Sequence, residues 1–162
     1  MLSKILSKSD CASCKFCCSF KRQSLWETPV FTLEQKENLE KKYPSAKFKK
    51  IGKSFTVNLD DSYKTDNPKE EAPCPFLNAD TGCVLSQEEK PFDCSIWPFR
   101  ACKKDGDLKV MLENTCQAIN KVPYAKIRAL IVDDGLGKKI LEQARKNPDT
   151  LKDYSQEYMI IE

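Results

Sequence analysis

Histidine is absent from this chain of 162 residues. Without an imidazole, the chain cannot build a Ser-His or Cys-His nucleophilic site, a zinc hydrolase with histidine ligands, a histidine-held haem or an imidazole general base. Glycine is also scarce, with five residues, and there is no P-loop, no G-x-G-x-x-G run and no nucleophile elbow. No nucleotide site can therefore be read from the sequence.

Long hydrophobic runs are missing as well. The longest purely apolar stretch covers residues 129–132, whereas a membrane-spanning helix needs about 20 apolar residues. Residues 1–8 also lack the apolar core of a secretory signal peptide. We therefore expect no membrane partner and a cytoplasmic location.

The basic residues are mixed with acids along the chain. The net charge is +3, and residues 1–56 carry 12 Lys and Arg against 5 Asp and Glu. In residues 33–43, however, lysines alternate with acids, and only four residues of the whole chain are arginine. This pattern is typical of a solvated face. We do not expect nucleic acid as a partner, while a protein partner stays open.

The first half of the chain predicts one helix and two short strands. The capping-box sequence T-L-E-Q starts a helix over residues 32–43, and the proline that follows ends it. Strands are expected at residues 47–51 and 54–59, the second with alternating apolar and polar side chains. Residues 60–72 are polar and predict an exposed loop.

The second half predicts irregular loops around its cysteines, followed by helices. An Asp-Gly turn precedes one expected strand at residues 108–112. Residues 123–146 have the apolar spacing of a helix that two glycines interrupt before a second helix at residues 138–146. Residues 150–161 predict one more short helix.

Together these elements predict an α+β fold in a single domain, residues 1–162. We expect a small, irregular, cysteine-clasped metal-binding domain with few short strands and with C-terminal helices. Its motif region covers residues 11–118, and a C-terminal helical segment covers residues 119–162. A chain of this length, with 40% hydrophobic residues, can bury a core of its own.

Cysteine is the residue that this chain has in excess, at nine positions. A disulfide scaffold does not fit, because such chains are small and secreted and pair an even number of cysteines. Packing as a buried thiol suits an isolated residue such as Cys102, which we expect to be structural or free. The run Cys11-x-x-Cys14-x-x-Cys17-Cys18 instead indicates metal, since a C-x-x-C turn lets two sulfurs converge on one ion.

Cys17 and Cys18 are adjacent, so it must be decided whether both belong to the same group of metal ligands. Adjacent residues normally direct their side chains apart, so we expect Cys17 to complete the set begun upstream and Cys18 to face a separate group of sulfurs. The remaining ligands must come from residues 73–116, because residues 19–72 contain no cysteine. A metal would then join distant segments, and its removal should loosen both.

The whole set consists of C-x-x-C-x-x-C-C, then C-P-F-L, then G-C-V-L, then P-x-x-C with W-P-F after it, and a late cysteine. This set resembles the YkgJ-type cysteine-cluster family, which is described as a zinc- or iron-chelating domain. The resemblance implies eight metal ligands. They are Cys11, Cys14, Cys17, Cys18, Cys74, Cys83, Cys94 and Cys116.

An iron–sulfur cluster, of the 4Fe–4S type, is the favoured cofactor, and zinc is the alternative. Three ligands from one tight run and one from afar are typical of such a cluster. The leading hypothesis is therefore a protein that binds a metal ion or cluster and has a redox or metal-handling role.

Two alternatives come from other functional classes. Flagellin lysine N-methylases have related cysteine patterns, and this more distant resemblance implies a cluster-dependent, protein-modifying enzyme with acids such as Asp80 or Asp93 near its substrate. The other alternative is a structural zinc module for interaction with another macromolecule. Whether the chain is an enzyme is therefore left open.

Overall fold

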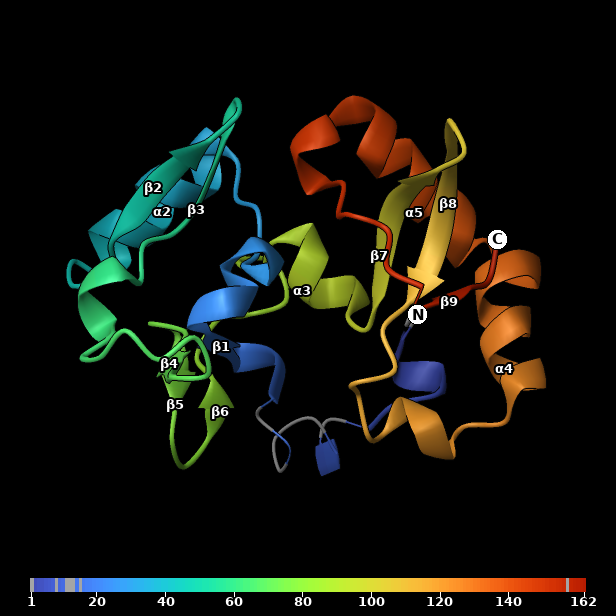
Figure 1. The fold of residues 1–162 in the computed structure, drawn as a ribbon, viewed down its shortest axis with the longest axis horizontal. Helices are drawn as coiled ribbons and strands as arrows, with labels where there is room; N and C mark the ends of the chain where they lie inside the picture. Colours follow the sequence, from blue (N-terminus) through green and yellow to red (C-terminus); the bar gives the residue numbers. More distant parts are fainter. Residues whose placement is uncertain (1, 8, 11–13, 15, 157) are drawn as a thin grey trace. The chain divides into compact units, whose positions relative to one another are not determined.

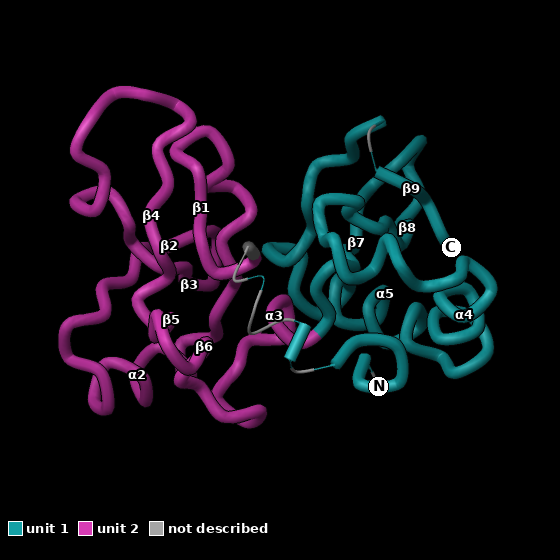
Figure 2. The backbone as a smooth tube through the Cα atoms, turned by 90° about the horizontal axis from the view of Figure 1, so that it is seen from below, with its two compact units in different colours: residues 1–14, 96–162 teal, residues 15–95 magenta. Residues whose placement is uncertain are grey.

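The computed structural model describes residues 2–7, 9–10, 14, 16–156 and 158–162. Its helices and small antiparallel sheets confirm the α+β class (Figure 1). The chain divides into two compact units (Figure 2): unit 1 comprises residues 1–14 and 96–162, and unit 2 comprises residues 15–95. The motif region, residues 11–118, therefore contributes to both units.

Unit 2 contains three two-stranded antiparallel sheets. They pair β1 (Ser19–Lys21) with β4 (Glu71–Pro73), β2 (Phe48–Ile51) with β3 (Ser54–Val57), and β5 (Leu77–Asn78) with β6 (Gly82–Cys83). The other elements are the 3-10 helices Phe16–Cys18, Arg22–Glu27 and Asp60–Ser62, and the α-helices α2 (Leu33–Lys42) and α3 (Phe92–Ile96), the last residue of which belongs to unit 1.

Helix α2 begins at the predicted capping box. The Thr32 hydroxyl accepts a hydrogen bond from the Gln35 N–H at 3.2 Å, and the Gln35 side-chain oxygen accepts one from the Thr32 N–H at 3.0 Å. These bonds satisfy donors that the first turn of a helix otherwise leaves unpaired. The helix ends at Lys42, one residue before the predicted end.

Unit 2 has an aromatic core centred on Phe76, which is 1% exposed. The centroid of its ring lies 5.5 Å from that of Tyr43 and 6.2 Å from those of Phe31 and Phe48. Rings at these separations add favourable edge contacts to the burial of their apolar area. Phe48 belongs to the predicted β2–β3 hairpin, which is confirmed with slightly shorter strands.

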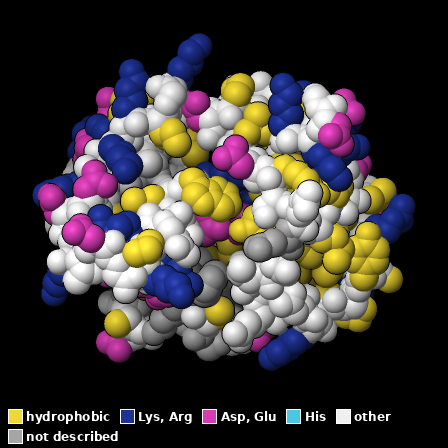
Figure 3. Space-filling view, viewed as in Figure 1, with side chains coloured by type: hydrophobic (Ala, Val, Ile, Leu, Met, Phe, Trp, Pro, Cys, Tyr) yellow, Lys and Arg dark blue, Asp and Glu magenta, His cyan; other side chains and the backbone are white. Residues whose placement is uncertain are grey.

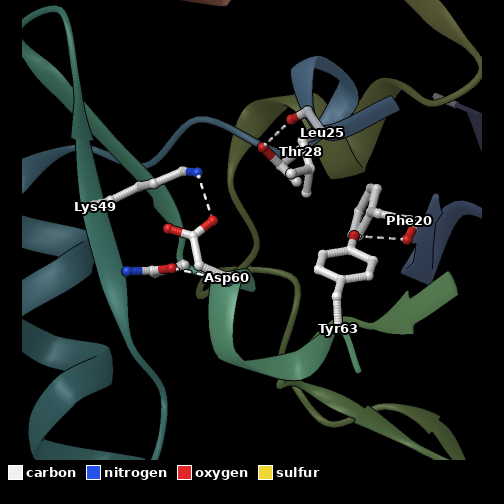
Figure 4. Close-up of polar contacts among 7 residues, drawn as sticks. Phe20, Leu25, Thr28, Lys49, Asp60 and Tyr63 are labelled. Atoms are coloured by element: carbon white, nitrogen blue, oxygen red, sulfur yellow. Dashed lines mark hydrogen bonds and ion pairs between the residues drawn. The ribbon is translucent and has the colours of Figure 1, made fainter. Parts of the chain in front are cut away.

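The polar segment 60–72, predicted as an exposed loop, is partly packed against this core. Tyr63 is buried, and its hydroxyl donates a hydrogen bond to the Phe20 carbonyl oxygen at 2.8 Å (Figure 4). The end of the segment enters β4, where the buried Ala72 lies opposite Phe20 of β1. The sequence does not predict strand β4, because the segment is mostly charged. A single small apolar residue, Ala72, is enough to face the core.

The sheet of unit 1 has three antiparallel strands in the order β7 (Phe99–Lys104), β8 (Asp107–Leu112) and β9 (Met159–Ile160). Asp105 and Gly106 form the predicted turn, with φ values of 52° and 88° that suit a tight hairpin. The sequence does not predict β7. The prediction of a short helix within residues 150–161 is wrong, because Met159 and Ile160 form strand β9 and pair with β8.

The predicted C-terminal helices are present in unit 1. They are α4 (Tyr124–Arg128), a π-helix (Ala129–Asp133) and α5 (Leu136–Lys146), and 3-10 helices cover Leu2–Lys4, Ile119–Lys121 and Pro148–Thr150. Helix α5 packs against β7 and β8 (Figure 1). The interruption falls at Gly135, which has a φ of 77°, whereas Gly137 lies inside α5. The second helix therefore begins two residues earlier than predicted.

Candidate metal centre

Five of the predicted ligands belong to unit 2, and four of them lie close together at its small sheets. Cys17 and Cys18 end a 3-10 helix directly before β1, and Cys74 directly follows β4. Because β1 pairs with β4, the Cys74 N–H donates a hydrogen bond to the Cys18 carbonyl oxygen at 2.7 Å. The ladder thus brings together two cysteine segments that are distant in the sequence.

The β5–β6 hairpin holds the fourth cysteine next to Cys74. Cys83, on β6, pairs with Leu77 of β5. The Leu77 N–H donates to the Cys74 carbonyl oxygen at 3.0 Å, and the Val84 N–H donates to the Phe76 carbonyl oxygen at 2.9 Å. These bonds fix the backbone of the Cys74 turn against the strand that contains Cys83.

The sulfurs of the adjacent pair lie near each other. The distance between the Cys17 Sγ and the Cys18 Sγ is 3.9 Å, so the two side chains do not diverge as expected, and the assignment of the two sulfurs to separate groups stays a prediction. That expectation assumes one regular backbone conformation through both residues. Here the chain changes from a 3-10 helix to β1 directly after Cys18, and this change of conformation lets the two sulfurs lie on the same side.

The surroundings of Cys74 govern the charge of its thiol. Burial is the main cause that raises the pKa of Cys74 to about 12, while electrostatic interaction with the nearby Cys83 and Cys17 raises it further and a hydrogen bond from the Phe76 N–H to its sulfur lowers it. In the absence of a cation, this thiol stays protonated at neutral pH. A soft cation among these sulfurs would reverse that preference, since a coordinating thiol loses its proton.

The backbone positions these four cysteines, but their sulfurs are not closed around one point. Among the residues that the structure describes, no group of three or more Cys, Asp or Glu side chains is arranged to hold a metal ion. Cys14, Cys18, Cys74, Cys83 and Cys102 are free thiols. The arrangement therefore provides soft sulfur donors within one small region, and binding would require side-chain rotation.

Of the other four predicted ligands, the structure describes three. Cys94 is exposed on α3, at the end of unit 2. Cys14 is exposed and Cys116 is buried, and both belong to unit 1. Cys11 lies outside the described residues. No strand pairing in the described part of the chain joins Cys14, Cys94 or Cys116 to the group formed by Cys17, Cys18, Cys74 and Cys83.

Cys102 has the surroundings of a packing residue. It is 0% exposed in β7, opposite Lys109 of β8, and forms a bridge to Lys152. Burial raises the pKa of its thiol. A cysteine in such a position behaves as a small hydrophobic side chain, and the prediction that it is not a ligand still awaits a direct test.

The two acids of the enzyme hypothesis lie in different surroundings. The buried Asp93 carboxylate accepts a hydrogen bond from the Val30 N–H at 3.1 Å. Asp80 lies in the exposed turn between β5 and β6, where its N–H donates to the Asn78 side-chain oxygen at 2.8 Å. Asp93 is thus unavailable to a macromolecular substrate while this region is folded.

Sequence reasoning missed the contribution of Phe76. Its backbone N–H reaches the Cys74 sulfur, its carbonyl oxygen holds Val84, and its ring fills the core. The available signal was the C-P-F-L run itself, since a turn after a ligating cysteine commonly directs backbone N–H groups to the thiolate.

One finding bears on the expected partners, and it concerns the membrane. No helix in the described ranges is long and apolar enough to cross a membrane. On the face drawn in Figure 3, Lys and Arg side chains are scattered and alternate with acids.

No family model matches the chain, and no curated protein or solved structure matches it either. The resemblance to the YkgJ-type family therefore rests on the cysteine pattern alone.

Proposed function

We propose that this protein binds a metal through its cysteines, as an iron–sulfur cluster or as zinc, and that its role is redox or metal handling. One observation carries the proposal: the β1–β4 ladder and the β5–β6 hairpin bring Cys17, Cys18, Cys74 and Cys83 into one region of unit 2. Thiolates are the donors that zinc and iron–sulfur clusters prefer.

The architecture around these cysteines supports a stabilising role for the metal. The strands β1, β4, β5 and β6 have two or three residues each, and isolated pairs of such short strands are only marginally stable in water. Metal binding would contribute folding free energy at this end of the unit. The protein would then hold its ligands in a region that the metal itself orders.

The residues of this chain have distinct parts in such a centre. Cys17, Cys18, Cys74 and Cys83 would supply thiolates, and the Phe76 N–H would stabilise the charge on the Cys74 sulfur. The aromatic core next to Cys74 would exclude water from that side. A reducing compartment such as the cytoplasm would keep the thiols available.

The test is metal and acid-labile sulfide analysis of the full chain, purified without oxygen and under reducing conditions. The proposal predicts zinc, or iron with sulfide, at a fixed ratio to protein. A colourless protein with zinc and no sulfide would select the zinc form. The proposal is refuted if neither metal binds after reconstitution with zinc and, separately, with iron and sulfide.

A further inference from the structure

We infer that a cleft in unit 2 binds a small zwitterion with an apolar part, such as an α-amino acid with an aliphatic side chain. The cleft has a volume of about 410 Å³, within the range of about 300–1,000 Å³ that is typical of small-molecule sites. Its lining comes from three segments, which lie within residues 45–47, 58–62 and 73–77. The inference goes beyond the proposed function and does not depend on metal binding by the cysteines.

The lining of the cleft includes two opposite charges that lie side by side. The Lys47 Nζ is 3.3 Å from the Asp61 carboxylate, and both side chains are largely exposed. This distance exceeds the roughly 2.7–2.9 Å of a strong charge-assisted hydrogen bond. An exposed pair of this kind contributes little to stability, so it can open to admit a ligand.

The pair of charges selects the class of ligand. A simple anion that approaches Lys47 also meets the carboxylate of Asp61, and a simple cation meets the same two groups in the reverse order. An α-amino acid has an ammonium group and a carboxylate on the same carbon atom. It can therefore pair its carboxylate with Lys47 and its ammonium group with Asp61 at the same time.

The cleft also has an apolar part. Pro73, Pro75 and Leu77 line it from one segment, and Leu59 lines it from the segment that contains Asp61. Contact with these side chains would remove an aliphatic group of the ligand from water, and proline has no side-chain freedom to lose on binding. The cleft should therefore prefer leucine to glycine.

Backbone hydrogen bonds hold the charged part of the cleft in place. The Asn58 N–H donates to the Lys47 carbonyl oxygen at 2.7 Å, directly beyond the last pair of the β2–β3 ladder. The Ser62 N–H donates to the Leu59 carbonyl oxygen at 2.9 Å and closes the turn that contains Asp61. Since a site that is fixed before binding loses little conformational entropy, this geometry favours binding of a small ligand.

The test is a titration of the isotope-labelled full chain, as purified under reducing conditions, with L-leucine as the probe. We expect saturable chemical-shift changes at the amides of Asn58, Ser62 and Leu77, with a dissociation constant of about 1 mM because the charged groups are exposed. Isocaproate lacks the ammonium group of leucine and isoamylamine lacks its carboxylate, and each should bind about fivefold more weakly. Glycine should bind about tenfold more weakly.

Two pairs of substitutions place the ligand in the cleft. Lys47→Gln with Asp61→Asn removes both charges and should weaken leucine binding by about tenfold. The matched control is Lys49→Gln with Asp60→Asn, which removes an exposed ion pair of 3.4 Å (Figure 4) whose residues lie outside the lining of the cleft. The control should bind leucine as the wild type does. Because all four side chains are at the surface, both variants should fold.

Several results would overturn the inference. They are equal affinity for leucine and isocaproate, unchanged binding after Lys47→Gln with Asp61→Asn, loss of binding in the control, or no saturable shift at about 50 times the expected dissociation constant. Metal analysis of the same preparation keeps the two proposals apart. A protein that binds leucine but no metal supports this inference and refutes the proposed function, and a protein that binds metal but no leucine does the reverse.

Discussion

The two units of this chain differ in how their elements are held together. Unit 1 has a three-stranded sheet with two six-residue strands, and α5 packs against it. Unit 2 instead has three two-stranded sheets, and their strands are only two to four residues long. Regular pairing and a covering helix stabilise unit 1, whereas the short sheets of unit 2 need support from side chains.

The cysteines follow the same division. Cys102 of unit 1 is surrounded by the sheet and has no exposed surface, so it packs as an apolar residue. Cys74 of unit 2 lies near Cys17 and Cys83. Cysteine thus packs as a core residue in the three-stranded sheet of unit 1. In unit 2, where the sheets are short, Cys74 lies beside other cysteines.

Each unit contains one tryptophan, Trp26 in unit 2 and Trp97 in unit 1. Fluorescence in a Trp97→Phe background therefore reports on unit 2, and fluorescence in a Trp26→Phe background reports on unit 1. The stability effects of the four substitutions below are measured in these two backgrounds.

The largest effect is expected for Phe76→Ala, which empties the centre of the aromatic core of unit 2. Removal of a fully buried ring should lower the free energy of unfolding by about 3–5 kcal/mol, measured by urea denaturation through Trp26. Phe76→Leu, which keeps most of the volume, should cost less than about 1.5 kcal/mol. An equal loss reported by Trp97 would show that the two units unfold as one.

The next effect, in unit 1, is expected for Gly137→Ala. A Cβ at this position would lie 2.8 Å from the Ile131 Cγ2 and 2.9 Å from the Ile131 carbonyl oxygen. The clash should destabilise unit 1 by about 1–3 kcal/mol, although alanine favours a helix over glycine by about 1 kcal/mol. The measurement is thermal unfolding followed by the fluorescence of Trp97. The control is Lys138→Ala at the exposed neighbouring position, and its free energy of unfolding should stay within about 0.5 kcal/mol of wild type. A stabilised Gly137→Ala protein would contradict the close approach.

Loss of the capping box should have a smaller effect, confined to unit 2. Thr32→Ala removes the hydroxyl that accepts from the Gln35 N–H and should cost about 1 kcal/mol. Thr32→Ser keeps the acceptor and should stay close to wild type. Urea denaturation through Trp26 checks both, and equal values for the alanine and serine proteins would argue against the cap.

The smallest effect is expected at the surface of α2. The ion pair between the Lys36 Nζ and the Glu40 carboxylate, at 2.9 Å, is partly exposed, and i,i+4 pairs of this kind contribute about 0.3–0.5 kcal/mol. Glu40→Gln should lose that amount at low ionic strength and nothing at 1 M salt. A loss above about 1 kcal/mol in the Trp26 signal would mean that Glu40 has a further structural role.

Local signals predicted the elements that depend on their own residues. Thr32 and Gln35 suffice to place the start of α2, and the Asp105-Gly106 turn placed β8. Strand β7 lacks such a signal, because its residues F-R-A-C-K-K mix apolar and charged side chains on both faces. Strand β9 has two residues, and its conformation follows from pairing with β8 rather than from its own sequence.

The same distinction applies to the candidate site. The spacing of the cysteines predicts that they are ligands, and this stays a prediction. Which of them lie together depends on the pairing of Ser19 with Pro73, a long-range contact that no local pattern specifies. The small separation of the Cys17 and Cys18 sulfurs is not predicted for the same reason, since the change of backbone conformation after Cys18 depends on that pairing.

Hydrogen exchange of the full chain, loaded with zinc and then stripped by a chelator under reducing conditions, tests the central claim most directly. We predict that the amides of Cys74, Leu77 and Val84, which hold the cysteine region of unit 2 together, lose protection when the metal is removed. The amides of Val110 and Ile161, which join β8 to the C-terminal segment in unit 1, should keep theirs. Unchanged protection at Cys74, Leu77 and Val84 in fully stripped protein would contradict the claim that metal orders this part of the molecule.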